Sequence, residues 1–172
     1  CCLQTTETSQ GLAQTRTEYD SRHRPILQID ALGQMTHIEY EENFTQGILR
    51  TIVTDPLGNQ TITTQNSIGQ VTEQIRKDPL GTLTARSCYS YDLAGHKIQQ
   101  IDTAIASNLP SRTIITEWVY DSMGRVIALT EAKETPEQKC TSYIYNERGQ
   151  KETIYLPDGT ALHHTYDGLG RL

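Results

Sequence analysis

The feature that most constrains this chain is a four-residue motif, Asp-x-x-Gly, that recurs along its length. In two of the copies Asn replaces Asp. The eight copies span residues 30–33, 55–58, 66–69, 78–81, 92–95, 121–124, 146–149 and 167–170. A chain of 172 residues with 12 glycines would contain about one such motif by chance. The repetition therefore indicates an internal structural repeat.

An Asp-x-x-Gly segment has the chemistry of a tight turn. An Asp or Asn side chain at the first position of a type I turn accepts a hydrogen bond from the backbone N–H two residues later. Gly at the fourth position adopts the left-handed conformation that closes a three-residue hairpin loop with a bulge. Pro56 and Pro79 directly follow an Asp, where their fixed φ suits the turn. The segment 157–160, Pro-Asp-Gly-Thr, predicts a different and shorter hairpin of the Asp-Gly kind.

The spacing of the turns and the residues between them predict β-strands. Gly58, Gly69, Gly81 and Gly95 follow one another at intervals of 11, 12 and 14 residues, close to the rhythm of short strands joined by tight turns. Segments between the turns, such as residues 112–120, are rich in β-branched and aromatic residues. We therefore predict an all-β fold of tandem antiparallel β-hairpins, forming a curved, strip-like sheet of about thirteen strands without helices.

The same spacing divides the chain. We expect the hairpin array to occupy residues 15–172, as a fragment of a longer array, with residues 1–14 as an N-terminal boundary segment that could be flexible. A loop is expected over residues 41–47, and longer, exposed connections around residues 103–111 and 131–138. These two connections are the expected places for contacts with a specific partner.

Composition narrows the class of protein. Apolar residues make up 35% of the chain, and nine Tyr accompany one Trp and one Phe, which favours a half-buried sheet with little interior of its own. The net charge of −6 and the scattered Lys and Arg argue against a nucleic-acid partner. No stretch approaches the roughly 18 apolar residues of a membrane span. No initiating Met or signal peptide is present, which we interpret as a chain cut from a longer one, so that targeting cannot be read from it.

The four cysteines leave the cellular compartment open. Cys1 and Cys2 are adjacent, which disfavours a bridge between them. Cys88 and Cys140 could pair only if their strands lie side by side. Cys1 could carry lipid, as in a mature lipoprotein, although a boundary within a longer chain explains it more simply.

Five of the turns are preceded by tyrosine. These residues are Tyr19, Tyr91, Tyr120, Tyr145 and Tyr166. A tyrosine at the same place in successive hairpins would stack beside its counterpart in the neighbouring unit, and such cross-strand aromatic pairs contribute roughly 0.2–1 kcal/mol each. We predict a tyrosine ladder that maintains strand register, rather than a surface on which ligands stack.

Together these residues resemble the YD repeat of the RHS-repeat proteins, over roughly residues 15–172. The copies at 120–126 and 166–172 are the clearest, whereas the copy at 19–24 has His23 in the glycine position. The residues that carry the resemblance are Tyr91, Asp92, Gly95, Tyr120, Asp121, Gly124, Arg125, Tyr145, Asn146, Gly149, Tyr166, Asp167, Gly170 and Arg171. The Asp-Pro-Leu-Gly segments at 55–58 and 78–81 echo the start of that family's self-cleaving region, but neither is followed by Gly-Gly and we interpret both as ordinary turns.

The resemblance implies an architecture rather than a reaction. RHS repeats form a long β-sheet strip that spirals into a hollow shell around a toxic C-terminal domain in polymorphic toxins and insecticidal toxin complexes, and a related barrel occurs in teneurins. The implied partners are the remainder of the same shell and an encapsulated C-terminal effector domain. The implied location is secreted or cell-surface.

No residue pattern predicts catalysis, a metal or a cofactor. His163 and His164 are adjacent, so on a strand they point to opposite faces and cannot ligate one metal together. Glu41 and Glu42 are interpreted as a solvated pair in a loop, and no nucleophile elbow or phosphate-binding loop is present. We therefore predict a non-catalytic structural segment of an RHS/YD-repeat shell that encloses or displays a toxin or effector domain. The alternative is an extracellular binding or adhesion module that recognises glycan or a surface receptor through its Tyr face and insertion loops.

Overall fold

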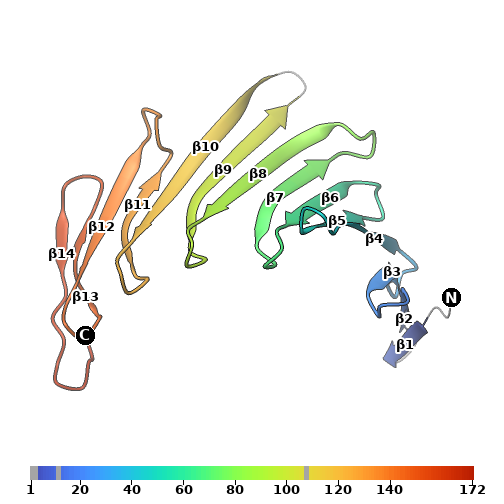
Figure 1. Ribbon diagram of the computed structural model, residues 1–172, viewed down its shortest axis with the longest axis horizontal. Helices are drawn as coiled ribbons and strands as arrows, with labels where there is room; N and C mark the ends of the chain where they lie inside the picture. The colour runs from blue at the N-terminus through green and yellow to red at the C-terminus, as the bar shows by residue number, and fades with distance from the viewer. Residues whose placement is uncertain (1–3, 11–12, 107–108) are drawn as a thin grey trace. The chain divides into compact units, whose positions relative to one another are not determined.

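The structure is a computed structural model that describes residues 4–10, 13–106 and 109–172. These residues form β-strands connected by turns, and none of the described residues is helical (Figure 1). The strands are β1 Gln4–Gln10, β2 Ala13–Tyr19, β3 Pro25–Ile29, β4 Met35–Asn43, β5 Ile48–Thr54, β6 Gln60–Gln65, β7 Val71–Lys77, β8 Leu83–Tyr91, β9 Lys97–Ala106, β10 Leu109–Tyr120, β11 Val126–Glu131, β12 Lys139–Tyr145, β13 Lys151–Tyr155 and β14 Ala161–His163.

The strands follow one another in the sheet in the order in which they occur in the chain, β1 to β14. The pairs with a described register are antiparallel, as between Ile62 of β6 and Ile75 of β7. The predicted all-β fold of tandem antiparallel hairpins is therefore confirmed. The described part of the chain contains one strand more than the roughly thirteen predicted. Strand β1 pairs with β2, from Gln4 with Tyr19 to Gln10 with Ala13.

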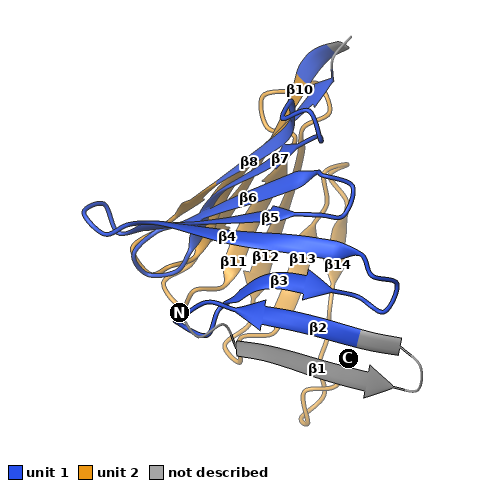
Figure 2. Cartoon of the chain, turned by 90° about the vertical axis from the view of Figure 1, so that its right-hand side faces the viewer, with its two compact units in different colours: residues 1–88, 104–111 blue, residues 89–103, 112–172 orange. Residues whose placement is uncertain are grey.

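The chain forms two compact units, which are described separately here (Figure 2). Unit 1 contains residues 1–88 and 104–111, and unit 2 contains residues 89–103 and 112–172. Because antiparallel strands reverse direction at every turn, alternate turns of a unit lie at the same end of its strands. In unit 1 the turns at 20–23, 43–47 and 66–69 alternate with those at 30–33, 55–58 and 78–81.

The turns share one backbone geometry. In the turn at Asp121, its N–H donates to the Arg125 carbonyl (2.9 Å) and the Gly124 N–H donates to the Asp121 carbonyl (3.0 Å). Gly124 has a φ of 77°, in the left-handed region. The register of β10 against β11 also shifts between Val119 and Tyr120, at the end of the strand that enters the turn. His23 adopts the same conformation in the turn that lacks glycine, with a φ of 61°.

The turn at residues 156–159 corrects one prediction. It is not a shorter hairpin: the Leu156 N–H donates to the Thr160 carbonyl (2.8 Å) and the Gly159 N–H to the Leu156 carbonyl (3.0 Å), as in the other turns. An Asp or Asn at the first position is therefore not required for this three-residue loop. Asp158, in the third position, accepts a hydrogen bond from the Thr160 N–H (2.8 Å) instead of forming the first-position contact.

Two predicted loops are shorter than expected, because strands extend into them. Glu41 and Glu42 lie in β4, where exposed and half-buried residues alternate from Met35 to Asn43, so the connection to β5 is only residues 44–47. The segment 103–111 is mostly strand, because β9 continues to Ala106 and β10 starts at Leu109. The connection at 131–138 is a loop over residues 132–138.

The sheet has almost no interior. Among the described side chains only Ile62, Thr64 and Thr153 are buried. Most other residues of the described strands are half-buried, so burial is spread over contacts between neighbouring strands instead of being concentrated in a core.

Candidate functional site

In the Asp-x-x-Gly and Asn-x-x-Gly turns the side chain at the first position binds the residue that follows the turn. Asp121 Oδ1 accepts hydrogen bonds from the backbone N–H groups of Met123 (2.9 Å) and Arg125 (3.0 Å). Its Oδ2 accepts one from Arg125 Nε (2.7 Å). The carboxylate thus fixes both the turn backbone and the side chain of Arg125.

The same arrangement recurs with other residue types. We call the residue directly after the fourth turn position the post-turn residue. In the other copies that resemble YD repeats, the post-turn residues are Arg24, His96, Gln150 and Arg171. Each has a side-chain contact to the first residue of its own turn, at 2.7–3.0 Å. Where Asn146 replaces Asp, the polarity reverses and Asn146 Nδ2 donates to Gln150 Oε1 (3.0 Å).

The tyrosine of one motif packs on the post-turn residue of the preceding motif. The Arg125 guanidinium lies 4.5 Å from the centroid of the Tyr145 ring, and the Tyr145 hydroxyl donates to the Val126 carbonyl (2.7 Å). Likewise the His96 ring stacks on Tyr120 with centroids 4.7 Å apart, and the Tyr120 hydroxyl donates to the carbonyl of the next residue, Lys97 (2.9 Å). We call this combination of ring contact and hydroxyl bond the tyrosine interlock.

The tyrosine interlock corrects the predicted ladder. At Tyr120 and Tyr145 the ring packs on His96 and on Arg125, rather than on the tyrosine of the neighbouring motif. A cationic or imidazole group is favourable there because the face of an aromatic ring carries negative potential. The interlock still joins consecutive motifs, so the tyrosine contacts link one hairpin to the next.

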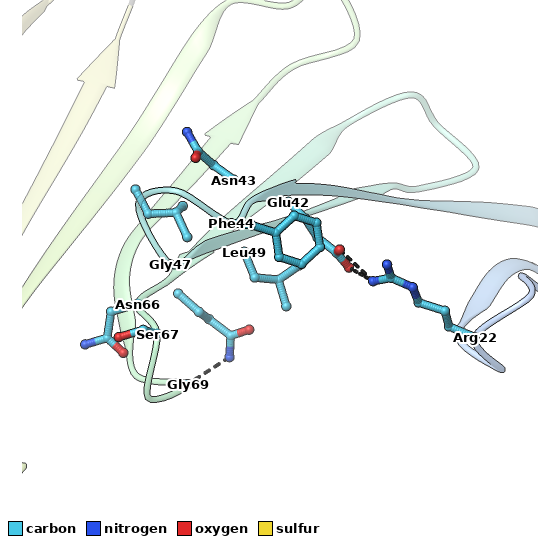
Figure 3. Close-up of a pocket in the computed structure, with 11 residues that line it drawn as sticks. Arg22, Glu42, Asn43, Phe44, Gly47, Leu49, Asn66, Ser67 and Gly69 are labelled. Atoms are coloured by element: carbon cyan, nitrogen blue, oxygen red, sulfur yellow. Dashed lines mark hydrogen bonds and ion pairs between the residues drawn. The ribbon is translucent and has the colours of Figure 1, made fainter.

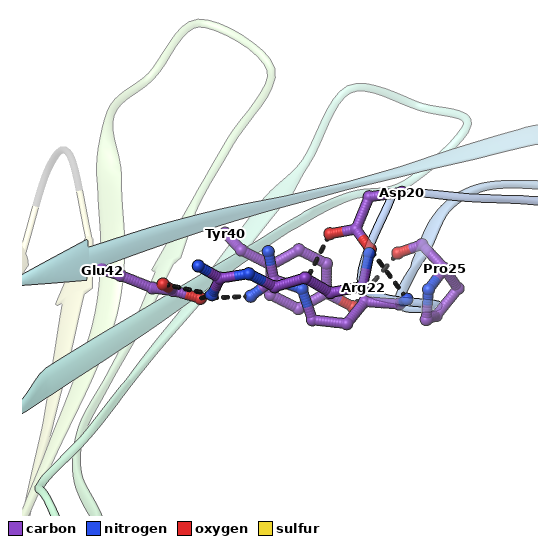
Figure 4. A network of polar contacts seen from close by, with 6 residues as sticks. Asp20, Arg22, Pro25, Tyr40 and Glu42 are labelled. Atoms are coloured by element: carbon purple, nitrogen blue, oxygen red, sulfur yellow. Dashed lines mark hydrogen bonds and ion pairs between the residues drawn. The ribbon is translucent and has the colours of Figure 1, made fainter. Parts of the chain in front are cut away.

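An interlock in unit 1 uses residues that the sequence did not single out (Figure 4). Tyr40 lies two residues further from its turn than the other tyrosines, yet the Arg24 guanidinium is 4.1 Å from its ring centroid and its hydroxyl donates to the Pro25 carbonyl (3.1 Å). Glu42 accepts hydrogen bonds from Arg22 (2.6 Å) and Arg24 (2.5 Å). Its interpretation as a solvated loop residue was therefore wrong. The sequence signal for a longer strand is the two-residue spacing of Ile38, Tyr40 and Glu42, which places all three on one face of β4.

The tyrosine of the last motif makes the hydroxyl hydrogen bond of the interlock. The Tyr166 hydroxyl donates to the Lys151 carbonyl (2.8 Å), directly after the post-turn residue Gln150. Gln150 Nε2 also donates to the Gly170 carbonyl (3.3 Å). Gln150 therefore contacts two successive turns, its own and that of the next motif.

The glycines leave space for these contacts. A Cβ on Gly124 would lie 2.8 Å from His96 Nε2, and one on Gly170 would lie 3.0 Å from Gln150 Nε2. In both cases the neighbour is the post-turn residue of the preceding motif. The glycine therefore permits the left-handed backbone and also the close approach of the next hairpin.

The aspartate carboxyls at the turns are stabilised in their ionised form, and the tyrosine hydroxyls in their protonated form. The backbone N–H of Arg125 and its guanidinium hold the pKa of Asp121 below its ordinary value, although partial desolvation opposes this. His96 lowers the pKa of Asp92 mainly through its ring contact with the carboxylate. Burial raises the pKa of the Tyr120 and Tyr145 hydroxyls, which are donors to carbonyls and therefore act in the protonated form.

The histidines, cysteines and carboxylates do not converge on a reactive centre. In the described residues no group of three or more His, Cys, Asp or Glu side chains could hold a metal ion. His163 Nδ1 lies 3.1 Å from Thr153 Oγ1, and His164 Nδ1 lies 3.2 Å from the Lys151 carbonyl. Cys88 and Cys140 are free thiols, and Cys1 and Cys2 lie outside the described residues. No helix in the described part of the chain is long and apolar enough to cross a membrane.

Comparison with known proteins finds likeness in structure alone. No family model and no curated protein sequence matches this chain. Solved structures do match. The crystal structure of TcdB2-TccC3-TEV has a TM-score of 0.61 at 17% identity, covering 96% of this chain and 9% of that one. The Photorhabdus luminescens Tc holotoxin pore has a TM-score of 0.56 at 14% identity, covering 90% of this chain and 10% of that one.

These matches establish the fold. The resemblance to RHS/YD-repeat proteins is confirmed at the level of fold. This chain spans about a tenth of the length of the chains that it matches.

Proposed function

We propose that this chain is a non-catalytic structural segment of an RHS/YD-repeat shell, which encloses or displays a toxin or effector domain of a secreted or cell-surface protein. The observation that carries the proposal is the tyrosine interlock, in which Tyr145 of one motif packs on Arg125 of the motif before it. Such contacts join a hairpin to the one before it, as an extended wall requires. The fold shared with Tc toxin complexes supports the same function.

In this proposal the motif residues have structural roles. Asp121 and its counterparts fix the turn and the post-turn side chain, and the turn glycines allow the next hairpin to approach. The tyrosines join successive motifs, and Arg125 is the surface on which the ring of Tyr145 rests. The polar groups of these residues are directed at one another and at the turn backbone, which is a structural use of them.

The alternative, a module that recognises glycan through tyrosine faces, receives less support. Carbohydrate stacks on exposed aromatic faces, but the faces of Tyr120 and Tyr145 meet His96 and Arg125, and their hydroxyls are bonded to backbone carbonyls. We therefore favour the shell segment.

Protease protection tests the proposal. The natural polypeptide that carries residues 1–172 would be digested with a broad-specificity protease, before and after the substitution Gly124→Val, which breaks one interlock. We expect a protected domain in the natural polypeptide, and cleavage of that domain in the variant. A polypeptide without a protected domain, or one whose domain is protected equally in the variant, would contradict an enclosing role.

A further inference from the structure

One motif in unit 1 lacks the tyrosine of its interlock. The residue before Asn66 is Gln65, where Tyr145 precedes Asn146 in a complete copy. Gln65 pairs with Leu49, which lies on the strand that follows the preceding turn. In the adjacent interlock Tyr40 rests on Arg24, the residue after its preceding turn. Gln65 thus occupies the position that corresponds to the tyrosine ring. Leu49 occupies the position that corresponds to Arg24.

A pocket lies at this incomplete interlock, which we call the Gln65 slot (Figure 3). Its volume is about 380 Å³, within the range of pockets that hold small ligands, and its wall includes Phe44, Ile48 and Leu49. The Gln65 amide donates to the Gly69 carbonyl (3.1 Å), and so is already engaged with its own turn. The slot therefore presents apolar carbon where a complete motif places a ring.

The two turns that border the slot are in close contact. A Cβ on Gly47 would lie 2.7 Å from the Cβ of Ser67, so only glycine allows this approach. The backbone at Gly47 is thus packed against the Ser67 side chain. The slot is therefore bounded by two turns of unit 1 that are in direct contact.

The charge at the rim complements an aromatic ring. The Arg22 guanidinium lies 5.9 Å from the Phe44 ring centroid and 2.6 Å from Glu42. Its side chain is 57% exposed, so a ring that enters the slot can approach it. Glu42 also binds Arg24, on which Tyr40 rests, so the slot is continuous with an existing interlock. The negative face of a ring next to a guanidinium is the contact that both Tyr40 and Tyr145 make.

We propose that the Gln65 slot binds a tyrosine side chain of a separate polypeptide segment. The occupant follows from the chain itself, since the corresponding positions of three other motifs are filled by tyrosine rings against Arg24, His96 and Arg125. The apolar floor binds the ring, and Arg22 faces its π-system. This inference rests on the slot alone and does not depend on the chain being part of a shell.

Peptide titration followed by NMR tests the proposal. The probes are the capped tripeptides acetyl-Gly-Tyr-Gly-amide and acetyl-Gly-Leu-Gly-amide, added to the isotopically labelled 172-residue chain. We expect the tyrosine peptide to shift the backbone amides of residues 44–49 and 65–69, with a dissociation constant on the order of 1 mM. The leucine peptide should bind about tenfold more weakly, since it lacks the ring. Shifts spread over other turns, or equal binding of both peptides, would overturn the proposal.

Filling the slot from within provides the matched control. Gln65→Tyr should complete the interlock, raise the melting temperature and abolish the shifts that the tyrosine peptide causes. Leu57→Tyr adds the same ring to an exposed turn at the other end of the strands and should leave binding unchanged. Persistence of the shifts in Gln65→Tyr, or a fall in its melting temperature, would contradict the inference.

A second variant removes part of the wall without filling the slot. Phe44 is 79% exposed in the turn between β4 and β5, so Phe44→Ser should leave the fold intact. It should weaken binding of the tyrosine peptide about tenfold, because the slot loses its only aromatic lining residue among those described. Unchanged binding would place the peptide elsewhere and overturn the proposal.

Discussion

At the scale of single residues, the post-turn residue connects two motifs, because it contacts its own turn and the tyrosine of the next motif. Arg125 is bound by Asp121 within its own turn and is covered by Tyr145 from the next motif. His96 has the same two contacts, with Asp92 and Tyr120. Arginine and histidine both suit the position because each presents a planar group with an N–H that can point at a carboxylate.

The turn glycines should differ in how much they tolerate a methyl group. Gly124→Ala places an L-residue at a φ of 77° and a Cβ 2.8 Å from His96, which is held between Tyr120 and Asp92. Gly69→Ala, at a φ of 82°, meets nothing within 4 Å. We expect losses in the free energy of unfolding of about 2–3 kcal/mol and about 1 kcal/mol respectively, by chemical denaturation. Equal losses would show that the close approach to His96 is not important.

The tyrosine hydroxyl should have a measurable share in the interlock. Tyr145→Phe keeps the ring on Arg125 but removes the hydrogen bond to the Val126 carbonyl, and should lower the free energy of unfolding by about 1 kcal/mol. Tyr143→Phe, in the same strand, is the control, because its hydroxyl has no hydrogen-bond partner within the described structure. A similar loss in both variants, measured by thermal unfolding, would argue against the interlock.

At the scale of elements, the turns could be predicted from sequence and the strand ends could not. An Asp-x-x-Gly turn is complete within five residues, so its geometry follows from local hydrogen bonds. The length of β4 depends instead on Glu42 finding Arg22 and Arg24, about twenty residues earlier in the chain. The segment 103–111, which contains Pro110, was predicted as a longer exposed connection, yet most of it continues β9 and β10.

The turns should make the protein sensitive to acid. Hydrogen bonds from turn backbone or post-turn side chains lower the pKa of Asp20, Asp55, Asp92, Asp121 and Asp167 in the folded state. The resulting stability is present above the ordinary aspartate pKa and is lost as the pH falls through the lowered values. We expect the melting temperature to decline below about pH 4.

A variant separates this effect from general acid denaturation. Asp121→Asn should be less stable at neutral pH, because it loses the ionic contact with Arg125, and its melting temperature should fall less steeply on acidification. Asn already occupies this position at residues 66 and 146, so the turn itself remains possible. A slope identical to that of the unmodified chain would contradict a role for the Asp121 carboxylate.

At the scale of the whole molecule, the main feature is how little is buried. Only three of the described side chains are buried, and each strand contacts the strands next to it in sequence. Stability in such an array is close to a sum of contacts between neighbours, so that no single core holds the fold. Large apolar side chains meanwhile remain at the turn tips, which isolated soluble proteins usually avoid in groups.

These exposed side chains should cause the isolated chain to associate. In unit 1, Leu32, Leu57 and Leu80 are 83%, 78% and 91% exposed, on turns at the same end of the strands. We expect static light scattering to show an apparent mass that rises with concentration. Replacing the three leucines with serine should lower that rise. A chain that remains monomeric at every concentration would show that these leucines do not cause self-association.

The sequence by itself determined the repeat, the turn chemistry and the all-β hairpin fold, because these depend on hydrogen bonds and side-chain alternation within a few residues. The tertiary structure alone decided that Tyr145 rests on Arg125, that Glu42 binds two arginines and that Gln65 borders an open slot. These contacts join residues far apart in the chain, and they depend on the register between strands. Register depends on the pairing of every strand with its neighbours and, at several turns, on a shift in the strand that enters the turn, so no single segment of sequence contains that information.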